Sequence, residues 1–124
     1  MKQKRGRVAV TPRFKLWMSS AQAEGVFGDG KWRLLRAISR EGSLKAAAQA
    51  LGMSYRKAWG DLRKAEECLK TALIEKHRGG RTGGRTDLTD AGRRWLSAYS
   101  RFRSDVEKTV ARAYERCIRG LLCE

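Results

Sequence analysis

The pattern of apolar and polar residues predicts two short strands followed by a helix. Residues 8–17, VAVTPRFKLW, alternate as a β-strand does, and Pro12 restricts any pairing to the edge of a sheet. After a loop-like stretch, residues 25–28, GVFG, are expected to form a short return strand. A helix is predicted over about residues 29–40, because apolar side chains recur there at helical spacing.

Two further helices are predicted next, and a very tight turn separates them. Ser43 is a good N-cap for the segment LKAAAQAL, which Gly52 ends, and Ser54 is a good N-cap for the segment YRKAWGDLRKAEECLK. Two helices joined by so short a turn containing glycine are typical of the helix-turn-helix motif. The alternative, an ordinary helical hairpin in a bundle, accounts less well for a third helix so rich in arginine and lysine.

A strand, a glycine-rich basic loop and a second strand are predicted after the third helix. ALIEKHR (72–78) and TDLT (86–89) are the strands, and GGRTGGRT (79–86) joins them. Directly behind a helix-turn-helix, this hairpin is interpreted as a wing. The loop also approaches a P-loop in sequence, but a P-loop leads immediately into a helix, and here residues 87–89 intervene. We therefore expect the loop to contact the phosphates of DNA.

Thr89 is predicted to cap a long last helix, from about Asp90 to Ile118 and roughly 40 Å long at about 1.5 Å per residue. Its apolar residues recur at spacings of three and four. A stripe of this length exceeds what a small domain can cover, so its distal half is expected to pair with a second copy of the chain. The alternative is a helix folded back on its own domain. The expected dimerisation residues are Trp95, Tyr99, Phe102, Val106, Val110 and Ala113.

The fold class that these elements predict is mainly α with a small β-hairpin, a winged helix-turn-helix with a long C-terminal helix. The 124 residues are enough for one domain. The expected organisation is a flexible basic N-terminus at 1–7, the DNA-binding domain at 8–88, the dimerisation helix at 89–118 and a tail at 119–124.

A strong positive charge is spread along the chain. Against 28 Lys and Arg stand 13 Asp and Glu, so the formal net charge is +15 and the isoelectric point is about 10.6. Such a charge indicates a polyanionic partner, most simply nucleic acid, and double-stranded DNA is the expected one. A solvated basic surface, as on many ribosome-associated proteins, is the alternative.

The composition also argues against several classes of protein. There is no run of about 18 apolar residues, so no membrane span is expected, and no apolar segment follows the basic start, so a cytoplasmic location is expected. Three cysteines without CxxC spacing and a single histidine argue against a metal site. No cofactor is expected. No reaction centre can be built from these residues, so the chain is not expected to be an enzyme.

On the third helix, one face is predicted to pack inward and the opposite face to contact DNA. The inward stripe is Ala58, Leu62, Ala65 and Leu69. A recognition helix presents its other face to a major groove, where Arg and Lys donate to guanine O6 and N7. The expected DNA-binding residues of this helix are Ser54, Tyr55, Arg56, Lys57, Gly60, Arg63 and Lys64. Those of the wing and the helix cap are Ser43, Lys45, Arg78, Arg81, Thr82 and Arg85.

Two residues of the third helix have two interpretations each. Gly60 costs about 1 kcal/mol relative to Ala in mid-helix. Either close approach to a duplex or a packing contact would offset that cost. Trp59 is either a base or sugar contact or a residue that flanks the core.

The run GSLKAAAQALGMSYRKAW, followed by LIEKHRGGRTGGRTDLTDAGRRWL, resembles the DNA-binding domain of the molybdenum-responsive ModE family. The likeness covers about residues 8–102. A more distant similarity to the LysR-type helix-turn-helix rests on S-x4-W-x2-L and DLTDAG. The resemblance implies a winged helix-turn-helix and a dimeric, operator-binding bacterial transcriptional regulator. ModE regulators also carry C-terminal molybdate-binding modules, which this chain is expected to lack, so molybdate sensing is not carried over and the effector is unknown.

The sequence therefore predicts a sequence-specific transcriptional regulator that binds duplex DNA as a homodimer. Three alternatives remain open. An architectural protein of the nucleoid type would bind DNA without reading its sequence. An oxyanion sensor for molybdate or tungstate would use the basic glycine-rich loop as its site. An RNA-binding protein is disfavoured. Typical readers of single-stranded RNA use exposed aromatic residues on a sheet, whereas Trp32, Trp95 and Phe102 are expected on the core faces of helices.

Overall fold

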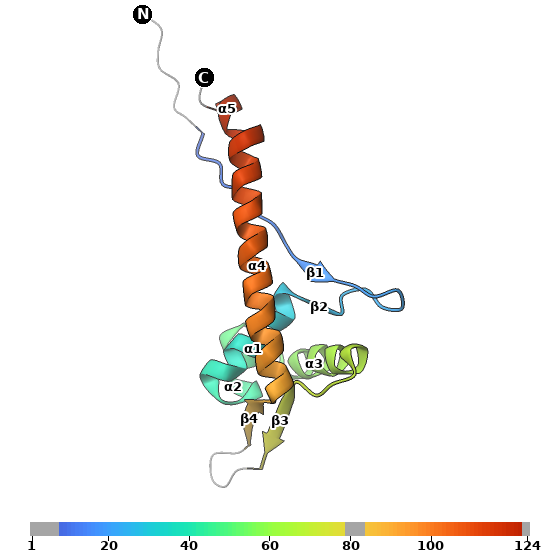
Figure 1. Ribbon diagram of the computed structural model, residues 1–124. Coiled ribbons are helices and arrows are strands. Elements are labelled where there is room, and N and C mark those ends of the chain that lie inside the picture. Colours follow the sequence, from blue (N-terminus) through green and yellow to red (C-terminus); the bar gives the residue numbers. More distant parts are fainter. Residues whose placement is uncertain (1–7, 79–83, 123–124) are drawn as a thin grey trace, which may run out of the picture.

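The structure is a computed structural model, and it describes residues 8–78 and 84–122. In chain order the elements are β1 (Trp17–Met18), β2 (Phe27–Gly28), α1 (Asp29–Glu41), α2 (Leu44–Ala50), α3 (Tyr55–Leu69), β3 (Ile74–His77), β4 (Arg85–Leu88), α4 (Asp90–Cys117) and α5 (Arg119–Leu122). Figure 1 shows α1, α2, α3 and the β3–β4 hairpin gathered at one end of α4, whose other end extends far beyond them. The predicted fold class, mainly helical with a small wing hairpin, is confirmed.

The prediction of an N-terminal strand is wrong for most of its length. Only Trp17–Met18 is a strand, and it pairs antiparallel with Phe27–Gly28, the second half of the return strand predicted over residues 25–28. Residues 8–16 instead run beside α4 (Figure 1), where the hydroxyl of Tyr114 donates to the carbonyl oxygen of Val10 at 2.9 Å. Alternation of apolar and polar residues does not produce a strand where a helix, and not another strand, lies alongside.

The predicted helix boundaries are confirmed by their caps. The hydroxyls of Ser43 and Ser54 each accept a hydrogen bond from the amide three residues on, at 3.0 Å. The hydroxyl of Thr89 does the same at the start of α4, at 2.9 Å. Gly42 ends α1 with φ 81° and Gly52 follows α2 with φ 69°, both in the left-handed region that favours glycine.

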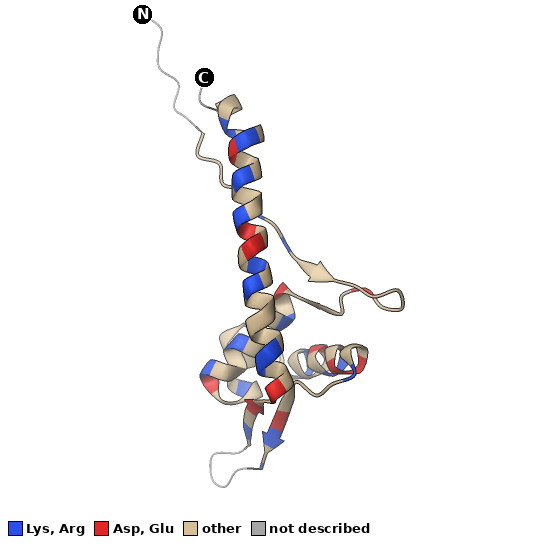
Figure 2. Ribbon diagram, in the orientation of Figure 1, with Lys and Arg blue, Asp and Glu red and all other residues tan. Residues whose placement is uncertain are grey.

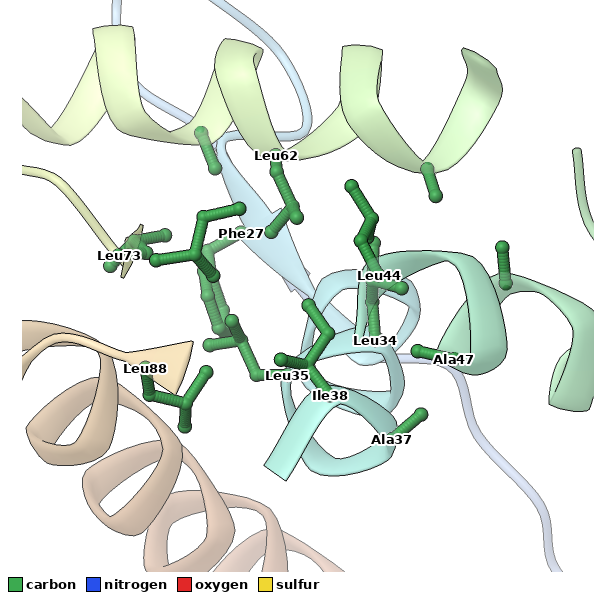
Figure 3. Packing of buried hydrophobic residues seen from close by; sticks show 14 of the residues in the cluster. Phe27, Leu34, Leu35, Ala37, Ile38, Leu44, Ala47, Leu62, Leu73 and Leu88 are labelled. Carbon is green, nitrogen blue, oxygen red and sulfur yellow. The ribbon is translucent and has the colours of Figure 1, made fainter. Parts of the chain in front are cut away.

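The three helices α1 to α3 enclose one hydrophobic core (Figure 3). Leu34, Leu35 and Ile38 of α1 lie at its centre, with Leu62 of α3 on one side and Leu88 of β4 on another. Small side chains at the α2–α3 contact let these helices approach closely. The fully buried alanines are Ala47 on α2 and Ala58 and Ala65 on α3. The predicted inward stripe of α3 is confirmed, with Leu69 at its partly buried end.

The wing hairpin is fixed to the start of α2. β3 and β4 pair antiparallel, with Ile74 opposite Leu88. The buried hydroxyl of Thr86 accepts from the amide of Leu44 at 3.2 Å, and the amide of Thr86 donates to the carbonyl oxygen of Gly42 at 2.9 Å. The hairpin therefore holds a defined position relative to the helix-turn-helix.

The start of α4 lies directly against the chain that enters β3. A Cβ atom at Gly92 would stand 2.1 Å from the carbonyl oxygen of Leu73, so only glycine fits there. The amide of Thr89 also donates to the Leu73 carbonyl, at 3.0 Å. The short α5 was not predicted, and it follows α4 in the segment expected to be a tail. Within residues 8–78 and 84–122, no helix combines the length and the apolarity that crossing a bilayer requires.

Candidate nucleic-acid interface

The outward side of α3 carries the predicted DNA-binding residues of the recognition helix. Together they form the recognition face, defined as Tyr55, Arg56, Lys57, Gly60, Arg63 and Lys64, and all six are exposed. The cap residue Ser54 is exposed as well. Lys57 pairs with Asp61 at 3.2 Å, a contact one turn along the exposed helix surface that leaves the ammonium accessible. The face therefore presents four cations and one aromatic ring to solvent.

 A groove lies between the recognition helix and the wing. The groove measures about 730 Å³ and is open to solvent. The residues that line it are Ser43, Leu44, Lys45, Tyr55, Lys76, His77, Arg78, Gly84, Arg85 and Thr86. We refer to it as the wing groove.

The wing groove brings together predicted residues from three separate elements. Ser43 and Lys45 come from the start of α2, Tyr55 from the start of α3, and Arg78 and Arg85 from the wing. Two further predicted residues, Arg81 and Thr82, lie outside the described residues. The predicted contacts of all these residues with DNA stay predictions, but the described ones share one surface.

Lys76 is a member of this surface that the sequence analysis missed. Its ammonium donates to the hydroxyl of Tyr55 and lies 4.3 Å from the centre of the Trp59 ring. Both contacts tie β3 to α3. Ile74, two residues earlier, is buried, so the two-residue period of a strand puts Lys76 on the same side, toward α3. That alternation is the signal by which Lys76 was predictable.

Trp59 packs against the core and is partly buried, which agrees with its interpretation as a residue that flanks the core. Its ring also carries cations on the surface side. The Arg63 guanidinium lies 5.5 Å from its centre, in addition to Lys76 at 4.3 Å. Attraction between a cation and an aromatic face holds such side chains in place without neutralising them. Trp59 thus orders positive charge between the recognition face and the wing.

Arg85 is held by an acidic neighbour on its own strand. Its guanidinium donates to the Asp87 carboxylate at 2.9 Å, and His77 of the facing strand lies 3.3 Å from the same carboxylate. The hydrogen bond from Arg85 lowers the pKa of Asp87, and the same bond raises the pKa of Arg85. The Arg85 side chain is nevertheless 69% exposed, so its charge remains available to a partner.

A buried polar cluster joins α1 to α4 and was not predicted. The Asp29 carboxylate accepts from the hydroxyl of Tyr99 at 2.9 Å, from the guanidinium of Arg103 at 2.9 Å and from the amide of Leu16 at 3.2 Å. Burial alone raises the pKa of Asp29, but the hydrogen bonds from Arg103, Tyr99 and Leu16 and the charge of Arg103 outweigh it, so the pKa is lowered. Burial raises the pKa of Tyr99, and the hydrogen bond that its hydroxyl donates to Asp29 raises it further.

This cluster changes the expected dimerisation surface. Tyr99 is only 2% exposed and Trp95 is partly buried, because both rings pack on Phe27 within the same chain. Tyr99 therefore belongs to the core of this domain and is not available to a second copy, whereas the part of Trp95 in dimerisation stays a prediction. Phe102 is 43% exposed. The other predicted residues, Val106, Val110 and Ala113, are partly exposed on the distal part of α4.

The comparisons with known proteins agree with this geometry. The family described as "Bacterial regulatory helix-turn-helix protein, lysR family" matches residues 30–93. Among curated proteins, the molybdenum transport protein ModE of Azotobacter vinelandii is 38% identical over 88 residues, 71% of this chain and 33% of that protein. The molybdenum-pterin-binding protein MopA of Rhodobacter capsulatus is 34% identical over 95 residues, 77% of this chain and 36% of that protein. The chain thus spans about a third of the length of these relatives.

Solved structures share the fold. The CbnR DBD–DNA complex superposes with a TM-score of 0.57 at 24% identity, covering 70% of this chain and 94% of that one. The BenM DBD complex with benA site 1 DNA superposes with a TM-score of 0.56 at 22% identity, covering 73% and 96%. At such identities the likeness shows the fold alone, and those two proteins were solved bound to DNA.

Proposed function

We propose that this chain, which belongs to the lysR family of bacterial regulatory helix-turn-helix proteins, binds specific sites on double-stranded DNA as a homodimer and so regulates transcription. The observation that carries the proposal is the position of the cations. The recognition face and the wing groove adjoin at Tyr55, so their charges lie on one continuous surface. Figure 2 shows basic residues on the helices at the wing end of the molecule and along α4.

The shape of this surface suits a duplex. α3 is a helix of 15 residues with an exposed basic side, and a major groove admits one α-helix. The wing projects from the same end of the molecule (Figure 1). With α3 in the major groove, Lys76, Arg78 and Arg85 are expected to contact the adjacent phosphates. Base edges then supply specificity through α3, and the wing supplies affinity.

The proposed dimer uses the distal part of α4. Beyond Arg103 this helix extends past the core, and its partly exposed apolar side continues from Phe102 through Val106 and Val110 to Ala113. A helix with such a side buries it against another element. A second copy supplies an identical stripe, and a two-fold arrangement of two copies matches a palindromic DNA site.

Competition binding tests the specificity in this proposal. A duplex is first enriched from a random pool of 30-base-pair DNA with the full chain, and its affinity is then compared with that of the unselected pool. A specific regulator is expected to prefer the enriched duplex by about 10³ or more, with affinity falling steeply as salt rises. Equal affinity for both DNAs indicates an architectural protein. Failure to bind either DNA at low salt contradicts the proposal.

Molybdate or tungstate sensing is the second candidate, favoured by the names of the ModE and MopA relatives, which refer to molybdenum, and by the cationic wing groove. Titration calorimetry of the DNA-free chain with molybdate tests it directly. Saturable binding that is lost in the Arg85→Ala variant supports an oxyanion site in the groove. Heats no larger than those of dilution count against it and leave the DNA measurements as the test of the main proposal.

A further inference from the structure

Gly60 lies in the middle of α3, where no packing contact among the described residues requires glycine. It is the sixth residue of a 15-residue helix, and its backbone is helical, a conformation that every residue except proline adopts readily. A Cβ atom built there meets no described atom within 4 Å. Packing therefore does not require glycine, and glycine is less favourable than alanine in a helix interior. The contrast with Gly92, where a Cβ collides with a carbonyl oxygen, is plain.

The surroundings of Gly60 point to a partner. The neighbours one turn before it are Arg56 and Lys57, those one turn after it are Arg63 and Lys64, and all four are exposed. Gly60 is on the side of the helix opposite the buried stripe, so it projects furthest from the core. The helix surface therefore has no side chain at position 60, and the four exposed residues one turn away from it are all cations.

We infer that Gly60 is the point of closest approach between α3 and DNA, where the missing side chain lets a base-pair edge on the floor of the major groove reach the helix backbone. The inference rests on the proposed function and adds a specificity determinant to it. The four surrounding cations then straddle that base pair and reach the neighbouring bases and phosphates. A side chain at position 60 would hold the helix away from the groove floor and lengthen all of these contacts together.

The experiment compares Gly60→Ala and Gly60→Leu with the matched variants Ser39→Ala and Ser39→Leu, which change an exposed position of α1. Melting temperatures are measured first. Binding is then measured by fluorescence anisotropy on the duplex enriched by the wild-type chain and on the unselected 30-base-pair pool. Gly60→Ala is expected to melt higher than the wild type, because alanine favours the helix. Its affinity for the enriched duplex is expected to fall about tenfold, the scale of one lost base contact.

Gly60→Leu is expected to lose more affinity for the enriched duplex than Gly60→Ala, and both should change binding to the unselected pool much less. The Ser39 variants should bind both DNAs as the wild type does. Gly60 variants that fold and bind the enriched duplex with wild-type affinity overturn the inference while leaving the proposed function intact. A wild-type chain that enriches no sequence and binds no duplex instead rejects the proposed function, and this inference with it.

Discussion

Replacing Asp29 by Asn is expected to destabilise the fold by about 3 kcal/mol. The Asp29 side chain is 9% exposed and that of Arg103 is 19% exposed, so the ion pair between them is largely removed from water. Removing one partner of a buried ion pair costs about 3–5 kcal/mol, because the other charge stays buried without its counterion. Arg103 keeps some access to solvent, which favours the lower end of that range.

Urea unfolding followed by tryptophan fluorescence measures this change, at one fixed protein concentration because the proposed dimerisation would add to apparent stability. For a domain of this size, about 3 kcal/mol corresponds to a melting temperature lower by about 10 °C. Glu41→Gln is the control. Glu41 pairs with Arg40 on the surface, where the two side chains are 35% and 59% exposed, and its loss is expected to cost less than about 1 kcal/mol.

The pH dependence of the same variant gives an independent test. The pKa of Asp29 is lowered in the folded protein from its ordinary value of 3.8. Its carboxylate therefore stabilises the fold above that ordinary value, and the stabilisation is lost as the pH falls through the lowered folded pKa. The gap between wild type and Asp29→Asn is expected to be constant at neutral pH and to narrow below about pH 4. A gap smaller than about 1 kcal/mol at neutral pH, or one that widens in acid, refutes the reasoning.

Three further predictions concern other parts of the fold. Gly92→Ala is expected to destabilise the protein by about 3 kcal/mol or more in urea unfolding, because its Cβ would stand 2.1 Å from the Leu73 carbonyl oxygen; wild-type stability would show that α4 shifts freely. Phe102→Asp is expected to give monomers in sedimentation velocity while Ser104→Asp stays dimeric, and a dimeric Phe102→Asp would contradict the proposed interface. Lys76→Met is expected to weaken DNA binding. It should also make the negative slope of log affinity against log salt shallower by about 1; an unchanged slope would mean that Lys76 neutralises no phosphate.

Those parts of the fold that depend on neighbouring residues were predictable from the sequence. Ser43, Ser54 and Thr89 each cap the helix that follows, and the spacing of apolar residues gave the inward side of α3. These signals are local: a cap needs an amide three residues away, and a helical stripe needs neighbours three and four residues away. The positions of the four predicted helices, α1 to α4, therefore follow from short stretches of sequence.

The parts that were not predicted depend on contacts between distant residues. Asp29 and Tyr99 are 70 positions apart and meet only after α4 packs across α1. Before that packing is known, Tyr99 is one more apolar residue of a long stripe, and its burial in the core cannot be separated from burial against a second copy. The same applies to residues 8–16, whose alternation fits a strand but whose neighbour is α4.

The packing of α4 links the two halves of the proposed function. At its start α4 is held against Leu73 next to the wing, and two turns later it is held to α1 through Asp29. Between Gly92 and the distal apolar stripe the helix contains neither proline nor glycine, the usual causes of a kink. The stripe is therefore fixed in distance and direction relative to the recognition face. In a two-fold dimer, the separation of the two recognition helices follows from these contacts within each chain, so the spacing of DNA half-sites is set by the fold itself.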